Sequence, residues 1–161
     1  MPTFDLSTSS PAQARADLLV LPFFEGREPG PGVAEAGQAL GGDLMDAAQA
    51  HGVSGKLGDT LTVPTLGRTK AKSVLLVGMG PKDGIGEGEV RKAAMRAGSR
   101  GSKFASMATT LGQLGSDAPA AARALAEGVT LGTYRFTRYK ERPIDEDSGK
   151  ANTVQVHRTC A

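Results

Sequence analysis

Two short and nearly continuous apolar runs constrain the fold of this chain more than any other feature. Residues 16–24 run ADLLVLPFF, and residues 73–79 run SVLLVGM. Each run has the length of a strand, and neither alternates apolar with polar residues, which is typical of strands buried on both faces of a sheet. A sheet buried on both faces needs helices on both sides, so an α/β domain is predicted.

Two segments have the spacing of helices that cover such a sheet. In residues 87–103, apolar side chains recur at i, i+3, i+4 and i+7: Val90, Ala93, Ala94 and Ala97. A long helix is predicted after Ser116 or Asp117, either of which can cap it, with Pro119 in the first turn. The side chains expected on its buried face are Ala122, Leu125, Val129, Gly132 and Phe136.

The remaining segments complete an alternating pattern. Strands are expected at residues 4–7, 60–66 (an edge strand), 104–110 and 153–156, and residues 25–32 are predicted to form a loop. Residues 33–51 predict one helix, or two that are broken at Gly41 and Gly42, with Asp43 as the cap of the second. The order is roughly ββαββαβαβ, which predicts a mostly parallel sheet with helices on both faces.

Composition excludes several classes of protein. The 161 residues suit one domain, and the mean hydropathy of -0.22 suits a soluble one. No run approaches the ~18 apolar residues of a membrane span. With 19 Lys and Arg against 17 Asp and Glu, a dedicated nucleic-acid binder is not expected. The lone Cys160 cannot form an internal disulfide, and residues 1–5 lack the features of a signal peptide, so a cytoplasmic location is predicted.

Residues that resemble parts of catalytic or binding sites are few, and each has a structural explanation. Gly78 and Gly80 follow the best strand, but the nucleotide fingerprint fails because Pro81 lacks an N–H and Asp83 stands where a third glycine is needed. His51 is expected on the surface at a helix end. His157 and Cys160 lack a carboxylate partner for a metal.

Two charged segments near the end of the chain are interpreted as solvated. The acidic group is Asp145, Glu146 and Asp147. The basic group is Arg135, Arg138, Lys140 and Arg142, with Tyr134, Phe136 and Tyr139 interleaved. Basic and aromatic residues together can bind nucleic acid, but at helical spacing the aromatics are expected to anchor a helix end. We therefore assign no catalytic, cofactor-binding or metal-binding residue.

Four segments, in order, resemble the N-terminal domain of the leucyl aminopeptidase (cytosol aminopeptidase) family. They are residues 55–59 (GKLGD), 73–80 (SVLLVGMG), 90–94 (VRKAA) and 131–140 (LGTYRFTRYK). The last segment, with its Tyr-x-Phe-x-x-Tyr-Lys spacing, is the most specific. The resemblance implies a fold similar to a macro domain, with a mixed sheet between helices.

The resemblance also implies that this chain is one domain of a longer enzyme whose catalytic residues lie in another domain. Residues 1–140 would form the N-terminal domain, and residues 141–161 a linker and the start of a catalytic domain. Two divalent metal ions (zinc or manganese) and the catalytic Lys and Arg belong to that C-terminal domain, whose NTDAEGR signature is absent here. This chain is then expected to be inactive alone, to partner its own catalytic domain, and to belong to a homo-oligomer, a hexamer by resemblance.

Two other functions remain open at this point. One is a stand-alone macro-like module that binds ADP-ribose or another nucleotide, which would need free N–H groups after Gly80. The other is a DNA-binding accessory domain, which would show a steep salt dependence of binding.

Overall fold

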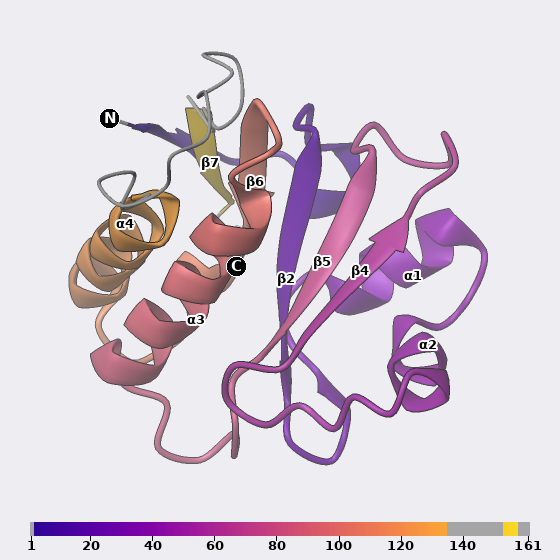
Figure 1. Cartoon of the computed structure of the whole chain (residues 1–161), viewed down its shortest axis with the longest axis horizontal. Helices are drawn as coiled ribbons and strands as arrows, with labels where there is room; N and C mark the ends of the chain where they lie inside the picture. The colour runs from indigo at the N-terminus through magenta and orange to yellow at the C-terminus, as the bar shows by residue number, and fades with distance from the viewer. Residues whose placement is uncertain (1, 135–152, 158–161) are drawn as a thin grey trace, which may run out of the picture.

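The computed structural model describes residues 2–134 and 153–157. Its strands are β1 (Thr3–Ser7), β2 (Leu18–Phe24), β3 (Glu28–Pro29), β4 (Thr60–Pro64), β5 (Ser73–Gly78), β6 (Ser106–Thr109) and β7 (Thr153–His157). They form one sheet in the order β1-β7-β6-β2-β5-β4, with β3 paired to β2 (Figure 1). Antiparallel pairs join β3 to β2 and β4 to β5, and the other pairs are parallel. The prediction of a mixed, mostly parallel sheet is confirmed.

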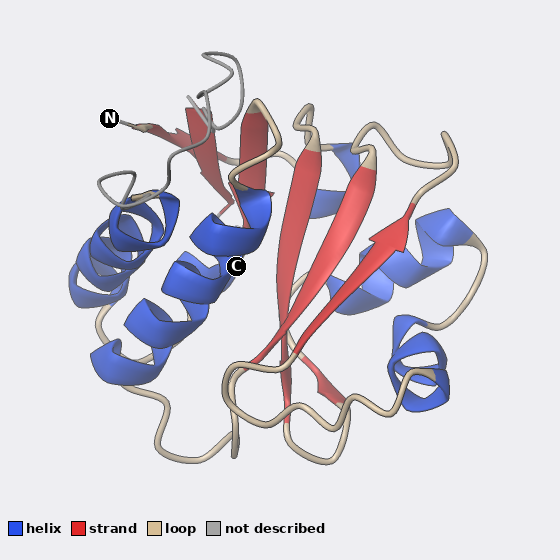
Figure 2. Ribbon diagram, viewed as in Figure 1, coloured by secondary structure: helices blue, strands red, loops and turns tan. Residues whose placement is uncertain are grey.

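Helices cover both faces of this sheet, as predicted (Figure 2). The helices α1 (Val33–Leu40) and α2 (Leu44–Ala50) lie on one face, and α3 (Glu87–Gly101) and α4 (Ala118–Thr133) lie on the other. Strand β2 is buried along its whole length because its side chains alternate between two cores. Leu18 and Val20 pack in the core under α3 and α4, whereas Leu19 and Leu21 pack under α1 and α2.

The two N-terminal helices separate where the sequence predicts a break. Gly41 ends α1 with a φ of 76°, a left-handed conformation that glycine adopts without strain. Asp43 then caps α2, and its carboxylate accepts a hydrogen bond from the N–H of Met45 at 2.8 Å. Within the described residues, no helix is both long and apolar enough to cross a membrane.

The long last helix differs in its buried face from the prediction. Ala122 is exposed, whereas the buried residues are Ala121, Ala124, Leu125, Gly128 and Val129. Leu125 and Val129 were expected on this face, and Phe136 lies outside the described residues. Because most residues in the first half of α4 are alanines, hydrophobicity distinguishes its faces poorly. Close packing against α3 selects the face instead.

Strand β7 stands within the sheet, between β1 and β6. Its residues include the possible last strand that the sequence predicts at 153–156, and Val154 is fully buried. Residues 153–157 therefore belong to the sheet, although they fall in the segment expected to follow the domain. The division at residue 140 otherwise remains a prediction, because residues 135–152 and 158–161 lie outside the described ranges.

The carboxylate of Asp17 links the amino ends of β2, β5 and β6. Asp17 forms an ion pair with Lys72 at 2.8 Å, just before β5, and accepts a hydrogen bond from the N–H of Ala105, just before β6, at 3.2 Å. The hydrogen bond from Lys72 holds the pKa of Asp17 below its ordinary value of 3.8. Because the folded pKa is depressed, the stabilisation is full above that ordinary value and is lost as the pH falls through the folded pKa.

We expect Asp17→Asn to lower the free energy of unfolding at neutral pH by at most about 1 kcal/mol, because Lys72 is largely solvent-exposed. The difference from the natural chain should shrink to nothing in strong acid, well below the ordinary pKa. Urea unfolding of both chains at a series of pH values measures this. A difference that persists in strong acid would mean that the charge of Asp17 is not its source.

Candidate functional site

The carboxyl ends of β2 and β5 lie at the edge of the sheet where open α/β sheets usually bind their ligands. Phe23 and Gly78 lie opposite each other there, and the turn through Met79 and Gly80 follows, as predicted. The N–H of Met79 donates to the carbonyl oxygen of Phe23 at 2.9 Å, and the N–H of Gly80 donates to that of Gly55, also at 2.9 Å. Pro81 has no N–H. The turn therefore offers no free donor at positions 79–81 for a phosphate.

The space over these strand ends is filled by a second turn, residues 54–59. Gly55 has a φ of 90°, and a Cβ atom there would lie 2.1 Å from the carbonyl oxygen of Phe24. A Cβ atom on Gly78 would likewise lie 2.1 Å from the carbonyl oxygen of Lys56. Glycine is therefore needed at both positions because two backbones meet, and the chain itself covers these strand ends.

Asp59 fixes the shape of this turn. One oxygen of its carboxylate accepts the N–H groups of Ser54, Gly55 and Lys56, each at 3.2 Å, and the hydroxyl of Ser54 at 3.3 Å. Hydrogen bonds to an ionised acceptor are stronger than neutral ones. The aspartate of the GKLGD segment thus acts as a structural anion that organises the turn.

Charged groups also fix the connection that leads from β5 to α3. Lys82 forms an ion pair with Glu28 of β3, which raises the pKa of Lys82. Glu89 accepts the N–H of Gly86 at 2.9 Å, and this bond holds the pKa of Glu89 below its ordinary value. Both shifts favour the charged forms, so neither group is tuned to exchange a proton near neutral pH.

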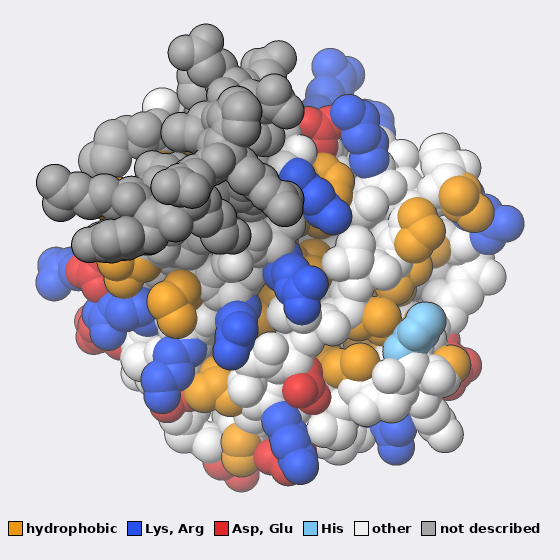
Figure 3. All heavy atoms as spheres, viewed as in Figure 1, with side chains coloured by type: hydrophobic (Ala, Val, Ile, Leu, Met, Phe, Trp, Pro, Cys, Tyr) orange, Lys and Arg blue, Asp and Glu red, His pale blue; other side chains and the backbone are white. Residues whose placement is uncertain are grey.

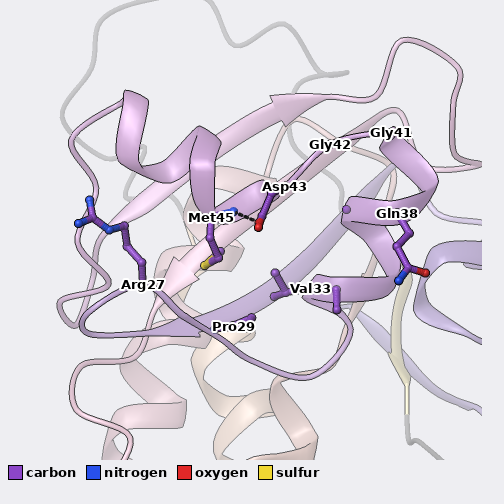
Figure 4. Close-up of a pocket in the computed structure, with 10 residues that line it drawn as sticks. Arg27, Pro29, Val33, Gln38, Gly41, Gly42, Asp43 and Met45 are labelled. Carbon is purple, nitrogen blue, oxygen red and sulfur yellow. Dashed lines mark hydrogen bonds between the residues drawn. The ribbon is translucent and has the colours of Figure 1, made fainter.

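A groove of about 700 Å³ lies beside α1 and α2, on the face of the sheet opposite to α3 and α4 (Figure 4). Pro29, Val33 and Met45 form its apolar floor, with Arg27 at one end and Gln38 at the other. Its carboxylate, Asp43, is already engaged as the cap of α2. The groove can hold an apolar group, but it brings together no acid, base and nucleophile.

Basic side chains follow the exposed side of α3 (Figure 3). They are Lys92, Arg96 and Arg100 on α3, and Lys103 just after the helix ends. Their spacing places them on one side of the helix, whose buried side faces the core. This basic stripe suits an acidic partner but contains no catalytic group.

The model of the cytosol aminopeptidase family's N-terminal domain matches residues 20–143. This chain belongs to that family. A probable cytosol aminopeptidase from Geobacter sp. (strain M21) is 37% identical over 144 residues, which cover 88% of this chain and 29% of the relative. The cytosol aminopeptidase of Pseudomonas aeruginosa strain PAO1 is 35% identical over 147 residues, again 88% of this chain and 30% of the relative. The chain thus spans about 30% of the length of these cytosol aminopeptidases.

Solved structures confirm the macro-domain-like fold. The macrodomain of Mycobacterium tuberculosis DarG superposes with a TM-score of 0.69 at 12% identity, covering 99% of this chain and 100% of that one. The Oceanobacillus iheyensis macrodomain with ADP gives 0.70 at 14% identity, covering 99% and 84%. The bottromycin maturation enzyme BotP gives 0.63 at 23% identity, covering 87% and 27%. At these identities the likeness concerns the fold alone.

The structure brings together two of the segments that resemble the cytosol aminopeptidase family. Residues 55–59 lie directly over the end of the 73–80 segment, so the glycines of both serve one close contact. The sequence resemblance identified both segments but not their contact, since nothing local in the sequence signals it.

The described residues include three of the other candidate site residues. His51 is exposed at the end of α2, as predicted. His157 ends β7, and Tyr134 is exposed at the end of α4. The basic and acidic segments at 135–147 and Cys160 lie outside the described residues. Within residues 2–134 and 153–157, no three His, Cys, Asp or Glu side chains are grouped so as to hold a metal ion.

Proposed function

We propose that this chain is the non-catalytic N-terminal domain of a cytoplasmic metallo-aminopeptidase that releases N-terminal amino acids from peptides. The two divalent metal ions implied by the family, zinc or manganese, would lie in a C-terminal catalytic domain. The N-terminal domain would serve the assembly of a homo-oligomer and access to its active site. Because β7 stands inside its sheet, the domain would extend through residue 157 and the linker to the catalytic domain would follow it.

The covering of the carboxyl ends of β2 and β5 carries this proposal. Proteins of this fold that bind a ligand need backbone donors at the carboxyl ends of the strands. Here the 54–59 turn covers the ends of β2 and β5, and the N–H groups of Met79 and Gly80 are committed to backbone carbonyls. A domain whose own chain covers these strand ends is better suited to contact other protein surfaces. The same geometry argues against the ADP-ribose-binding alternative.

A chimera tests the proposal. In the Pseudomonas aeruginosa enzyme, the matching 147-residue segment is replaced by this chain, or it is deleted. We expect the chimera to keep the oligomeric mass and the kcat for a leucine anilide. The deletion should lose assembly, or raise KM for longer peptides, while kcat for the small substrate is retained. Sedimentation velocity and steady-state kinetics measure these quantities, and thermal melts confirm that each protein is folded.

Two results would contradict the proposal. One is a folded deletion variant with unchanged assembly and unchanged KM for long peptides. The other is loss of small-substrate turnover in a deletion variant that still assembles, which would place this domain in the chemistry. Saturable binding of ADP-ribose by the isolated chain would instead favour the nucleotide-binding alternative.

A further inference from the structure

We propose that the turn between β4 and β5 of one copy of this chain docks into a small recess between the starts of α3 and α4 of a second copy. We call residues 65–72 the Leu66 turn and the recess the helix-start recess. This inference rests on the proposed assembly function and deepens it by naming the two surfaces that meet.

Leu66 is held in an unfavourable and exposed state. Its φ of 51° lies in the left-handed region, which bulky residues rarely adopt, and its side chain is 84% exposed. Asparagine or glycine would fit this backbone better, and a polar residue would suit the solvent better. A residue that is wrong for both its backbone and its surroundings is a candidate for a role outside the isolated fold.

The Leu66 turn is anchored, so it presents the leucine in a fixed position. The buried hydroxyl of Thr65 donates to the carbonyl oxygens of Ala71 and Lys72, at 2.5 and 3.1 Å. The guanidinium of Arg68 donates to the carbonyl oxygen of Leu40, at the end of α1, at 2.6 Å. A pre-ordered turn loses little conformational freedom on binding, which favours association.

The helix-start recess has the size and lining to receive a leucine. Its volume is about 170 Å³, and its apolar lining comes from Ile85, Val90, Leu114, Ala120 and Ala121. Truncation of a buried leucine to alanine leaves a cavity of about 150 Å³, so one leucine side chain fits. Val90 and Leu114 are nearly fully buried in the fold, so their positions are fixed.

Charge on the two surfaces is complementary. Besides Leu66, the Leu66 turn exposes Arg68 and Lys70, with no acidic residue between 65 and 72. The helix-start recess is rimmed by Glu87 and Asp117, both exposed. In the proposed contact, the basic Leu66 turn with its apolar leucine therefore faces the acidic rim of the apolar helix-start recess.

The contact must join two molecules. The Leu66 turn precedes β5, and the loop to α3 follows it, so six residues of strand, about 20 Å, separate them. Figure 1 shows the two regions at opposite ends of β5. A head-to-tail contact of this kind builds rings or open chains. One turn buries little area, so the contact is weak for an isolated pair and gains strength where other contacts hold the copies together.

Complementation between two variants tests this contact. Leu66→Asn removes the leucine but suits the left-handed backbone, and Ala120→Leu fills the helix-start recess from α4. Over chain concentrations up to about 1 mM, we expect the average mass of the natural chain to rise as the concentration rises. Each variant alone should stay monomeric, and an equimolar mixture should form 1:1 dimers that grow no further. Sedimentation equilibrium measures the average mass of the natural chain, of each variant and of the mixture. As a control, Leu131→Asn, at another exposed leucine, should associate like the natural chain.

The proposal is overturned if the natural chain stays monomeric, if Leu66→Asn associates normally, or if the mixture forms no dimer. Thermal melts verify that the variants are folded, and Leu66→Asn should melt at or above the temperature of the natural chain. If the chimera experiment supports an assembly role while this chain stays monomeric, the contact is wrong and the proposed function stands. If the chain complements as expected while domain deletion leaves the enzyme unchanged, the assembly function fails and the contact stands.

Discussion

Replacing Gly128 by alanine should lower the free energy of unfolding by about 1–3 kcal/mol, although alanine normally stabilises a helix. A Cβ atom at Gly128 would lie 2.4 Å from the carbonyl oxygen of Arg91 and 2.6 Å from the Cβ atom of Ala94, both on α3. These are backbone or near-backbone atoms, so no flexible side chain can move aside. The helices must separate, and the packing of Leu125 and Val129 loosens with them.

A matched control isolates the close contact from helix propensity. Gly88, in the first turn of α3, has nothing within 4 Å of its Cβ position. Gly88→Ala should therefore show the ordinary gain of up to about 1 kcal/mol. Urea unfolding of the natural chain and both variants gives the comparison. Equal gains at Gly88 and Gly128 would show that α3 and α4 do not approach this closely.

Patterns that repeat along the chain predicted the fold well. The runs at 16–24 and 73–79 became β2 and β5, because a strand buried on both faces needs apolar residues at successive positions. The 3.6-residue spacing of Val90, Ala93 and Ala97 became the buried face of α3. These features depend on neighbouring residues, so the sequence alone indicates them.

Elements that depend on distant contacts were not predicted. The two-residue strand β3 lies in the segment predicted to be a loop, and it forms because β2 supplies the pairing. Residue 66 was expected at the end of a strand, but the strand ends at Pro64 and Leu66 lies in the turn. Its strain and exposure arise from the hydrogen bonds of the turn, and no local pattern signals them.

For the turn at Gly78 and Gly80, the sequence excluded a nucleotide site, but only the structure explains why glycine is needed there. The sequence indicated that the turn at Gly78 is structural, because Pro81 and Asp83 break the nucleotide fingerprint. It did not show that residues 54–59 cover these strand ends, since the contact joins the turn to a strand end 30 residues before it (Phe24 to Ser54) and another 19 residues after it (Asp59 to Gly78). The glycines are needed for backbone contact, and this reason is invisible until the two backbones are placed together.

Replacing Gly55 by alanine should have a larger effect than the same change at Gly128, a loss of about 2–5 kcal/mol in the free energy of unfolding. The left-handed φ of 90° accounts for about 1–2 kcal/mol of it. The remainder comes from the clash of the new Cβ atom with the carbonyl group of Phe24, whose oxygen would lie 2.1 Å away. A whole domain is stable by only about 5–15 kcal/mol, so this variant should unfold easily.

Gly26→Ala separates the two causes, because Gly26 has a similar φ of 81° but nothing within 4 Å of its Cβ position. It should lose only the backbone part, about 1–2 kcal/mol. Urea unfolding at low temperature measures both variants, and the difference between them reports the contact between the 54–59 turn and β2. If Gly55→Ala is no less stable than Gly26→Ala, the turn does not press on the end of β2. The strand ends would then be open to a ligand, and the proposed role in assembly would lose the observation that carries it.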